Sequence, residues 1–196
     1  KKWLETDNFE EAFEKFNDKM EEIEQKLPKP LILENLIENG DFALDSNADG
    51  LADGFTIASS IPHTELVNEN VQRININGDG TGYFILSNGN LENSTDIIYF
   101  SCFVKTNLPN VRITVGNSAS RTDILNNETW KIYSISSVKV NRNGLEIIGL
   151  NLTEGYIETK YWTVINLTQT FGAGNEPTKE EMDEIINIIG WFDNEY

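Results

Sequence analysis

Apolar residues recur in alternating steps of four and three positions near the start of the chain, which is the spacing of one face of an α-helix. Each pair of steps spans about seven residues, the repeat of a coiled-coil seam. We therefore expect residues 1–27 to form an oligomerising helix, and bulky phenylalanines in the seam favour three helices over two. The seam consists of Phe9, Phe13, Phe16, Met20, Ile23 and Leu27.

The same pattern leaves a second arrangement open, an amphipathic helix that docks on its own domain. Lys19 and Glu24 flank the seam at positions suited to an ion pair between helices, and nearly every residue off the seam is polar. Both features favour self-association. Pro28 and Pro30 cannot continue the helix, so residues 28–34 are expected to form a stiff linker.

Beyond the linker the pattern changes to short β-rich runs separated by turns rich in glycine and asparagine. Residues 31–42 are expected to form one or two strands that end at Asn39-Gly40. Strands at this spacing, with no helix between them, predict an antiparallel sandwich or jelly roll over residues 35–196. The other predicted strands are residues 71–77, 82–87, 96–106, 111–116, 129–140, 145–152 and 156–167.

A second helical pattern lies near the C-terminus. Pro177 suits a helix start, Thr178 and Glu181 have the spacing of a capping box, and Gly190 suits the helix end. The apolar stripe between these signals predicts a short helix packed on the sandwich. This stripe consists of Met182, Ile185, Ile186 and Ile189.

Composition narrows the range of expected partners. The chain has 15 Lys and Arg residues against 32 Asp and Glu residues, a formal net charge of −17. Because no basic stripe is present, neither nucleic acid nor an anionic membrane surface is an expected partner, whereas divalent cations are. Cys102 is the single cysteine, and the apolar run around it predicts a buried side chain without a disulfide inside one chain.

The segment Asp45–Phe55, DSNADGLADGF, carries oxygen ligands at the spacing of a calcium-binding loop. Such a loop takes side-chain oxygens at positions 1, 3 and 5, glycine at 6, a backbone carbonyl at 7 and another oxygen at 9. Thr56 stands where a bidentate glutamate is expected, so at least one ligand would come from elsewhere. The predicted Ca²⁺ ligands are Asp45, Asn47, Asp49, the Leu51 carbonyl and Asp53.

This calcium ion is expected to be structural, and the protein is not expected to be an enzyme. A catalytic metal keeps an open coordination position and usually has a base nearby. His63 is the only histidine, and no cysteine or serine nucleophile motif lies beside it. The alternative for the loop is a turn rich in Asp and Asn whose carboxylates are solvated.

Aromatic residues that reach the surface of a sandwich are candidates for stacking on sugar rings. Tyr161 and Trp162 are adjacent in a predicted strand, so one of them must face away from the core. Trp130 opens a strand and is expected to serve structural packing. The predicted carbohydrate site consists of Tyr83, Tyr99, Tyr161, Trp162, Arg73 and Arg112, with Tyr133, Tyr156 and Asn117 as further candidates.

Several stretches resemble known families. NLIENGDFALDSNADGLADGF, residues 35–55, resembles the opening of carbohydrate-binding-module-like jelly rolls, and NETWKIYSIS, residues 127–136, resembles a late strand of those domains. The segment VINLTQTFGAGNEPTKEEMDEII…GWF, residues 164–192, resembles a segment of tail and baseplate proteins of bacteriophages with Gram-positive hosts. A coiled coil leading into a β head is also similar to a phage fibre or receptor-binding protein.

The resemblance implies an extracellular virion component at the tail tip or baseplate. It implies a homotrimer that contacts other tail proteins and binds a host cell-wall glycan. Two alternatives stay open. One is a purely structural connector that docks other virion proteins, and the other is an accessory glycan-binding domain of a larger hydrolase.

Overall fold

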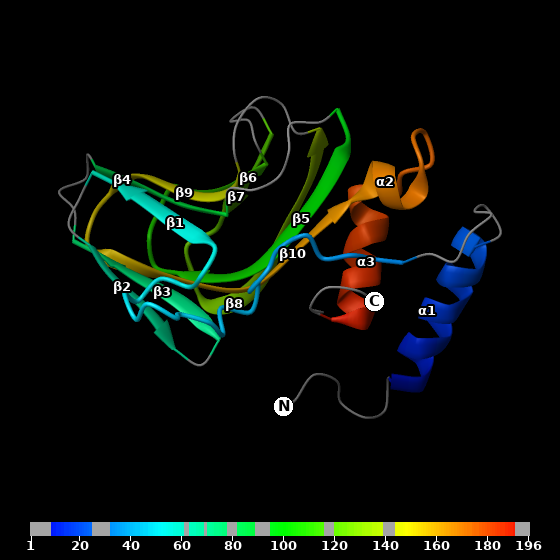
Figure 1. Cartoon of the computed structure of the whole chain (residues 1–196), viewed down its shortest axis with the longest axis horizontal. Helices are drawn as coiled ribbons and strands as arrows, with labels where there is room; N and C mark the ends of the chain where they lie inside the picture. The colour runs from blue at the N-terminus through cyan, green and yellow to red at the C-terminus, as the bar shows by residue number, and fades with distance from the viewer. Residues whose placement is uncertain are drawn as a thin grey trace.

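The computed structural model describes residues 9–24, 32–60, 63–68, 70–77, 82–88, 95–115, 120–138 and 144–190, which form a β-sandwich accompanied by helices (Figure 1). The helices are α1 (Phe9–Glu24), α2 (Leu167–Phe171) and α3 (Lys179–Ile189). The strands are β1 (Phe55–Ser59), β2 (His63–Asn68), β3 (Val71–Ile76), β4 (Gly82–Asn88), β5 (Ile97–Thr106), β6 (Val111–Val115), β7 (Arg121–Ile124), β8 (Asn127–Val138), β9 (Leu145–Leu152) and β10 (Gly155–Asn166).

These strands form two antiparallel sheets of five strands each within the described residues. The first sheet has the order β1-β4-β9-β6-β7, and the second sheet has the order β2-β3-β10-β5-β8. The chain passes repeatedly between the sheets, so strands that follow one another in the sequence often belong to different sheets. The predicted fold, a mainly β antiparallel sandwich of jelly-roll type with helices near both ends, is confirmed.

Seven predicted strands agree with β3, β4, β5, β6, β8, β9 and β10 to within a few residues. The prediction misses β1, β2 and β7, and it is wrong for the described residues 32–42, which form an irregular segment with an isolated bridge at Glu34. Asn39 and Phe42 have φ angles of 58° and 62°, in the left-handed region that interrupts an extended strand. A turn therefore replaces the strand there, closed by the Phe42 N–H bonding to the Asn39 carbonyl at 2.9 Å.

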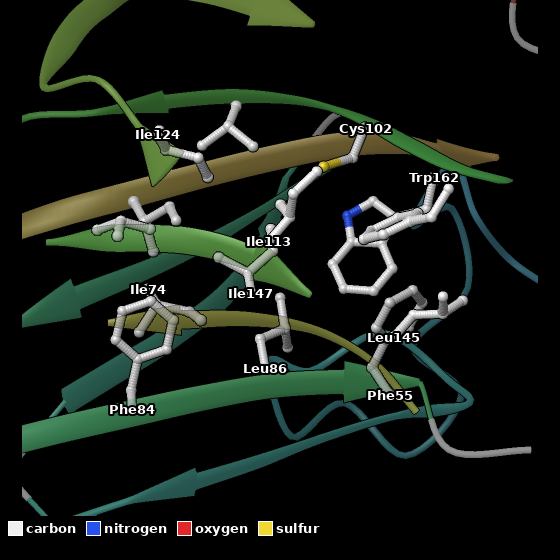
Figure 2. Packing of buried hydrophobic residues seen from close by; sticks show 14 of the residues in the cluster. Phe55, Ile74, Phe84, Leu86, Cys102, Ile113, Ile124, Leu145, Ile147 and Trp162 are labelled. Atoms are coloured by element: carbon white, nitrogen blue, oxygen red, sulfur yellow. The ribbon is translucent and has the colours of Figure 1, made fainter. Parts of the chain in front are cut away.

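The main core lies between the two sheets (Figure 2). Phe84 and Leu86 of β4 point inward from the first sheet, and Phe100 and Cys102 of β5 point inward from the second. The sulfur of Cys102 is buried, as predicted, and burial raises the pKa of its thiol above the usual value. Cys102 is therefore a small apolar packing residue that stays protonated.

A second apolar cluster lies on the outer face of the second sheet, where α2 and α3 pack. Met182, Ile185 and Ile186 of α3 contact Tyr99 of β5 and Ile165 of β10. The predicted capping box is present, and the Gly190 N–H closes the helix end on the Ile186 carbonyl. The two helices therefore cover one end of this face, and within the described residues the rest of it is open.

Helix α1 lies beside α3 and contacts it (Figure 1). Phe16 is buried, Ile23 packs against the second cluster, and Phe13 stays 50% exposed. Within one chain the seam is thus used partly for docking, while the homotrimer and the domain boundaries remain predictions. Leu27 lies outside the described residues. No helix of the described part is long and apolar enough to span a bilayer.

Candidate functional site

The open part of the outer face of the second sheet carries a group of aromatic and charged side chains. Beneath α3 this face is buried, as at Ser101 and Thr163. Further along the same strands the aromatic side chains are only partly buried. We call this surface the aromatic platform, and it consists of Phe103, Trp130, Tyr156 and Tyr161 together with Arg73, Lys105, Glu158 and Lys160.

Strand register brings these side chains together. Glu158 of β10 is paired with Arg73 of β3 on one side and with Lys105 of β5 on the other. One step along, Lys160 of β10 is paired with Phe103 of β5. Directly paired residues of antiparallel strands share a face of the sheet and contact one another. The platform is therefore built on regular strands rather than on loops.

Glu158 is the carboxylate at the centre of the platform. Only 9% of the residue is exposed, and its two oxygens accept from Arg73 at 2.7 Å and from Lys105 at 3.0 Å. The carboxylate raises the pKa of Lys105 through this hydrogen bond. The Arg73 guanidinium and the Lys105 ammonium also lie 4.6 and 5.5 Å from the ring centre of Tyr156. The ion pairs therefore fix the position of an aromatic ring as well as two charges.

Lys160 occupies the other end of the platform. Its ammonium lies 4.5 Å from the ring centre of Trp130 and 5.0 Å from that of Tyr161. The Tyr161 ring in turn packs edge-on against Phe103, with ring centres 6.1 Å apart. Partial burial lowers the pKa of Lys160, and Glu158 opposes this effect. Lys160 is thus a partly desolvated cation among aromatic rings.

A β-bulge in β10 decides which of two adjacent aromatic residues faces solvent. The register with β5 shifts between Lys160 and Thr163, where two residues of β10 oppose one residue of β5. Tyr161 has a φ of 55° there, which few residues other than glycine adopt. The extra residue shifts the alternation of side chains. Tyr161 therefore joins Lys160 outside, and Trp162 enters the core.

The irregular segment before the aspartate loop holds this bulge in place. The buried Asn35 side chain donates to the Trp162 carbonyl at 3.1 Å and accepts from the Val164 N–H at 2.9 Å. The Trp162 N–H donates to the Gly40 carbonyl at 2.9 Å. A β-carbon at position 40 would lie 2.5 Å from the Trp162 carbonyl oxygen, so only glycine allows this close approach. The segment thereby satisfies the backbone groups that the bulge removes from the ladder.

The structure separates the predicted carbohydrate residues. Arg73 and Tyr161 belong to the platform, whereas Tyr83 and Arg112 lie on β4 and β6 of the first sheet. The prediction is wrong for Tyr99 and Trp162, because both are fully buried and neither can stack on a sugar from solvent.

The two buried rings have structural partners. The Tyr99 hydroxyl donates to Asp183 of α3 at 2.8 Å, and the Trp162 indole N–H donates to Thr159 at 2.7 Å. Helix α3 therefore covers the first ring, and the bulge turns the second one inward.

Part of the platform was not predicted from the sequence. Phe103, Lys105, Glu158 and Lys160 are not among the predicted site residues, and Trp130 is not confined to packing, because its partly buried ring lies under the Lys160 ammonium. Of the further candidates, Tyr156 is in the platform, Tyr133 packs against the main core, and Asn117 lies outside the described residues. The alternation Tyr156, Glu158, Lys160 in YIETK places all three on one face, and this signal could have found the central strand.

The aspartate loop is closed by its own hydrogen bonds. The Asp45 carboxylate accepts from the N–H groups of Asp49 and Gly50 at 3.2 and 3.0 Å, and the Asp49 carboxylate accepts from Leu51 at 2.8 Å. Buried Gln72 of β3 donates to the Gly50 carbonyl at 3.0 Å. These bonds wrap the chain in a tight turn and anchor it to the second sheet.

The predicted calcium ligands are of the right chemical type, but their side chains already make hydrogen bonds within the loop. They offer the hard oxygens that Ca²⁺ prefers, but the Asp53 carboxylate accepts from the hydroxyl and the N–H of Ser46. Among the described residues, no three acidic, histidine or cysteine side chains are grouped as a metal site. Calcium would therefore compete with hydrogen bonds that these carboxylates already accept, and the site stays a prediction.

Comparison with known proteins finds no matching family model and no matching curated protein. Solved structures show a distant similarity of fold to carbohydrate-binding modules. A mutant of a family 29 carbohydrate binding module has 18% identity and a TM-score of 0.45, covering 61% of this chain and 85% of that one. The apo module BiXyn10A CBM1 has 16% identity and a TM-score of 0.44, covering 56% and 89%. A CBM29-2 mutant complexed with mannohexaose has 16% identity and a TM-score of 0.41, covering 69% and 89%.

Proposed function

We propose that the protein is a non-enzymatic glycan-binding domain and that the aromatic platform is its binding surface. The observation that carries this proposal is the set of four partly exposed aromatic rings on one open sheet face, interleaved with fixed cations. Aromatic rings offer large apolar faces at little conformational cost, and such faces suit the C–H faces of sugar rings. The charged groups between them suit hydroxyl and acidic substituents.

The two ion pairs of Glu158 favour glycan binding over glycan hydrolysis as the function. Glycoside hydrolysis uses two carboxyl groups on either side of the scissile bond. Glu158 is the carboxylate that the described residues place in the platform, and both of its oxygens are engaged by Arg73 and Lys105. Neither oxygen is therefore left without a cationic partner within the protein. Glu158 is therefore assigned a positioning role.

The biological setting is a further part of the proposal. The resemblance of residues 164–192 to phage tail and baseplate segments supports a virion component whose ligand is a cell-wall glycan of a Gram-positive host. The described part of this segment forms the end of β10, α2 and all of α3, and the two helices cover one end of the platform sheet. A structural connector is the second candidate. Ile132, which is paired with Phe103 at the platform and is 42% exposed, would suit a protein interface.

Binding of the full chain to a glycan array and to purified Gram-positive cell walls tests the proposal. Removing one stacked ring is expected to cost about 0.5–1.5 kcal/mol of binding, which is a twofold to tenfold loss of affinity for Tyr161→Ala or Trp130→Ala. Tyr83→Ala is the matched control, because Tyr83 is 40% exposed on the other sheet, and it should bind as the wild type does.

Two results would count against the platform. If the wild type bound neither arrayed glycans nor cell walls, the connector would be the better account. If Tyr83→Ala lost as much affinity as the two platform variants, binding would lie elsewhere on the sandwich.

We also propose that the aspartate loop binds a structural Ca²⁺ through Asp45, Asn47, Asp49, the Leu51 carbonyl and Asp53. At a calcium concentration a hundredfold above the dissociation constant, binding would stabilise the fold by about 2.7 kcal/mol. Transfer from calcium to EDTA is therefore expected to lower the melting temperature of the wild type. Asp49→Ala should melt at the same temperature in both solutions. Coincident wild-type melting curves in calcium and EDTA would leave the loop as a turn closed by its own carboxylates.

A further inference from the structure

The charge of the platform is opposite to that of the chain. The chain has a formal net charge of −17, yet the platform brings three cations, Arg73, Lys105 and Lys160, to one carboxylate. The surface of the platform is therefore locally positive, although the protein as a whole is acidic. The positive charge of the platform therefore favours a ligand that carries negative charge.

Two of these cations are largely committed to the protein. Arg73 and Lys105 share Glu158, so the three groups together keep a single positive charge. Arg73 also donates to Asn75 at 3.1 Å through its Nε. These contacts make Arg73 and Lys105 a rigid support for the Tyr156 ring rather than the main point of recognition.

Lys160 differs from both. Within the described residues, no carboxylate lies at ion-pair distance from its ammonium, and its neighbours are the rings of Trp130 and Tyr161. The two rings keep water from part of its ammonium group, and this partial burial lowers the pKa of the lysine. A partly desolvated cation gains most from an anionic partner. The bulge in β10 helps to form this site, because it places the Tyr161 ring on the same face of the sheet as Lys160.

We propose that the platform selects an anionic glycan, whose carboxylate or phosphate group binds Lys160 between Trp130 and Tyr161 while a sugar ring stacks on the aromatic faces. This inference rests on the proposed function and adds the chemical class of the ligand. Nucleic acid would offer rings and phosphates too, but an overall charge of −17 opposes a long polyanion. A short or sparsely charged glycan meets the positive platform without meeting much of the acidic surface.

The test compares ligands that share a backbone and differ in charge. Binding of the full chain is measured by calorimetry with oligogalacturonate and its methyl ester, and with phosphorylated and neutral mannan. Oligothymidylate is the non-glycan polyanion. We expect at least one charged glycan to bind about tenfold or more tightly than its neutral form at low salt. This preference should shrink in 0.5 M salt, where charges are screened beyond about 4 Å.

Lys160→Gln should remove the preference for the charged form over its neutral counterpart. Lys131→Gln is the matched control, since it removes the same charge from β8. The register pairs Lys131 with Val104, a core residue, so it faces away from the platform. This control should keep the full preference.

The outcomes separate the two proposals. Equal binding of charged and neutral forms, lost in Tyr161→Ala, would overturn the anionic inference and leave the glycan platform standing. Equal binding of oligothymidylate and charged glycan would overturn it in favour of a general polyanion surface. No binding to any of these probes would also overturn it, while glycan binding itself is judged by the array and the cell walls. A preference that survives Lys160→Gln would show that Lys160 is not the recognition group.

Discussion

Replacing Trp162 with alanine is expected to lower the free energy of unfolding by about 3–5 kcal/mol, the range for truncating a large buried aromatic side chain. The residue is fully buried, and its ring centre lies 5.0 Å from that of Phe55 and 4.9 Å from that of Phe100. Figure 2 shows the indole among core residues of the sandwich. Alanine would leave a cavity at this point and leave the Thr159 hydroxyl without its indole donor.

Urea unfolding monitored by circular dichroism measures the effect. For a chain of this size, the loss corresponds to a fall in melting temperature of roughly 6–20 °C. The adjacent Tyr161→Ala is the control, because its ring is on the open face; it should cost less than about 1 kcal/mol. The prediction on Trp162 would be wrong if the two variants had equal stability. Such a result would mean that the bulge does not direct the two rings to opposite sides.

Local signals explain why much of the fold can be predicted. The strands predicted correctly are runs of alternating or continuous apolar residues between clear turns, and their side-chain period needs no tertiary information. The helix α3 has a capping box, an apolar stripe and a terminal glycine, each of which acts within a few residues. By contrast, β1, β2 and β7 are only five, six and four residues long. The equally short β3 and β6 are predicted because each holds three β-branched aliphatic residues, whereas β2 has two adjacent aliphatic residues and β7 has one.

The binding surface is harder to predict because tertiary structure decides it. Tyr99 lies in a strand, and nothing in the sequence around it distinguishes it from an exposed aromatic residue. It is buried because α3 packs on it. Tyr83 and Arg73 both lie on strands, but no local pattern says that they belong to opposite sheets. Register between β3, β10 and β5 is what gathers Arg73, Glu158 and Lys105. Such pairings join residues far apart in the sequence.

The bulge in β10 is another feature that could not be predicted from the local sequence. Adjacency of Tyr161 and Trp162 predicts that one of them faces out, and this is confirmed. Strict alternation from Lys160, however, would place Tyr161 in the core and Trp162 outside. The extra residue in β10 reverses that assignment. Hydrogen bonds to this bulge come from a segment more than a hundred residues away, the one that carries Asn35.

Asn35→Ala is therefore expected to weaken both the fold and glycan binding, although Asn35 is not part of the platform. Its side chain is buried and satisfies the Trp162 carbonyl, the Val164 N–H and, at 3.3 Å, the Ile37 N–H. Each buried polar group left without a partner costs about 1–3 kcal/mol, and partial relaxation would recover some of that cost. We expect a loss of about 2–4 kcal/mol in the free energy of unfolding.

The matched control is Asn126→Ala, which removes one exposed hydrogen bond to the Asn107 carbonyl and should cost less than about 1 kcal/mol. Glycan affinity is measured at a temperature where Asn35→Ala is still folded. Because Asn35 holds the bulge that presents Tyr161, the affinity should fall to about the level of Tyr161→Ala. Normal affinity combined with reduced stability would show that the bulge persists without Asn35. Unchanged stability would contradict the hydrogen-bond account itself, since three buried backbone groups cannot lose their partner without cost.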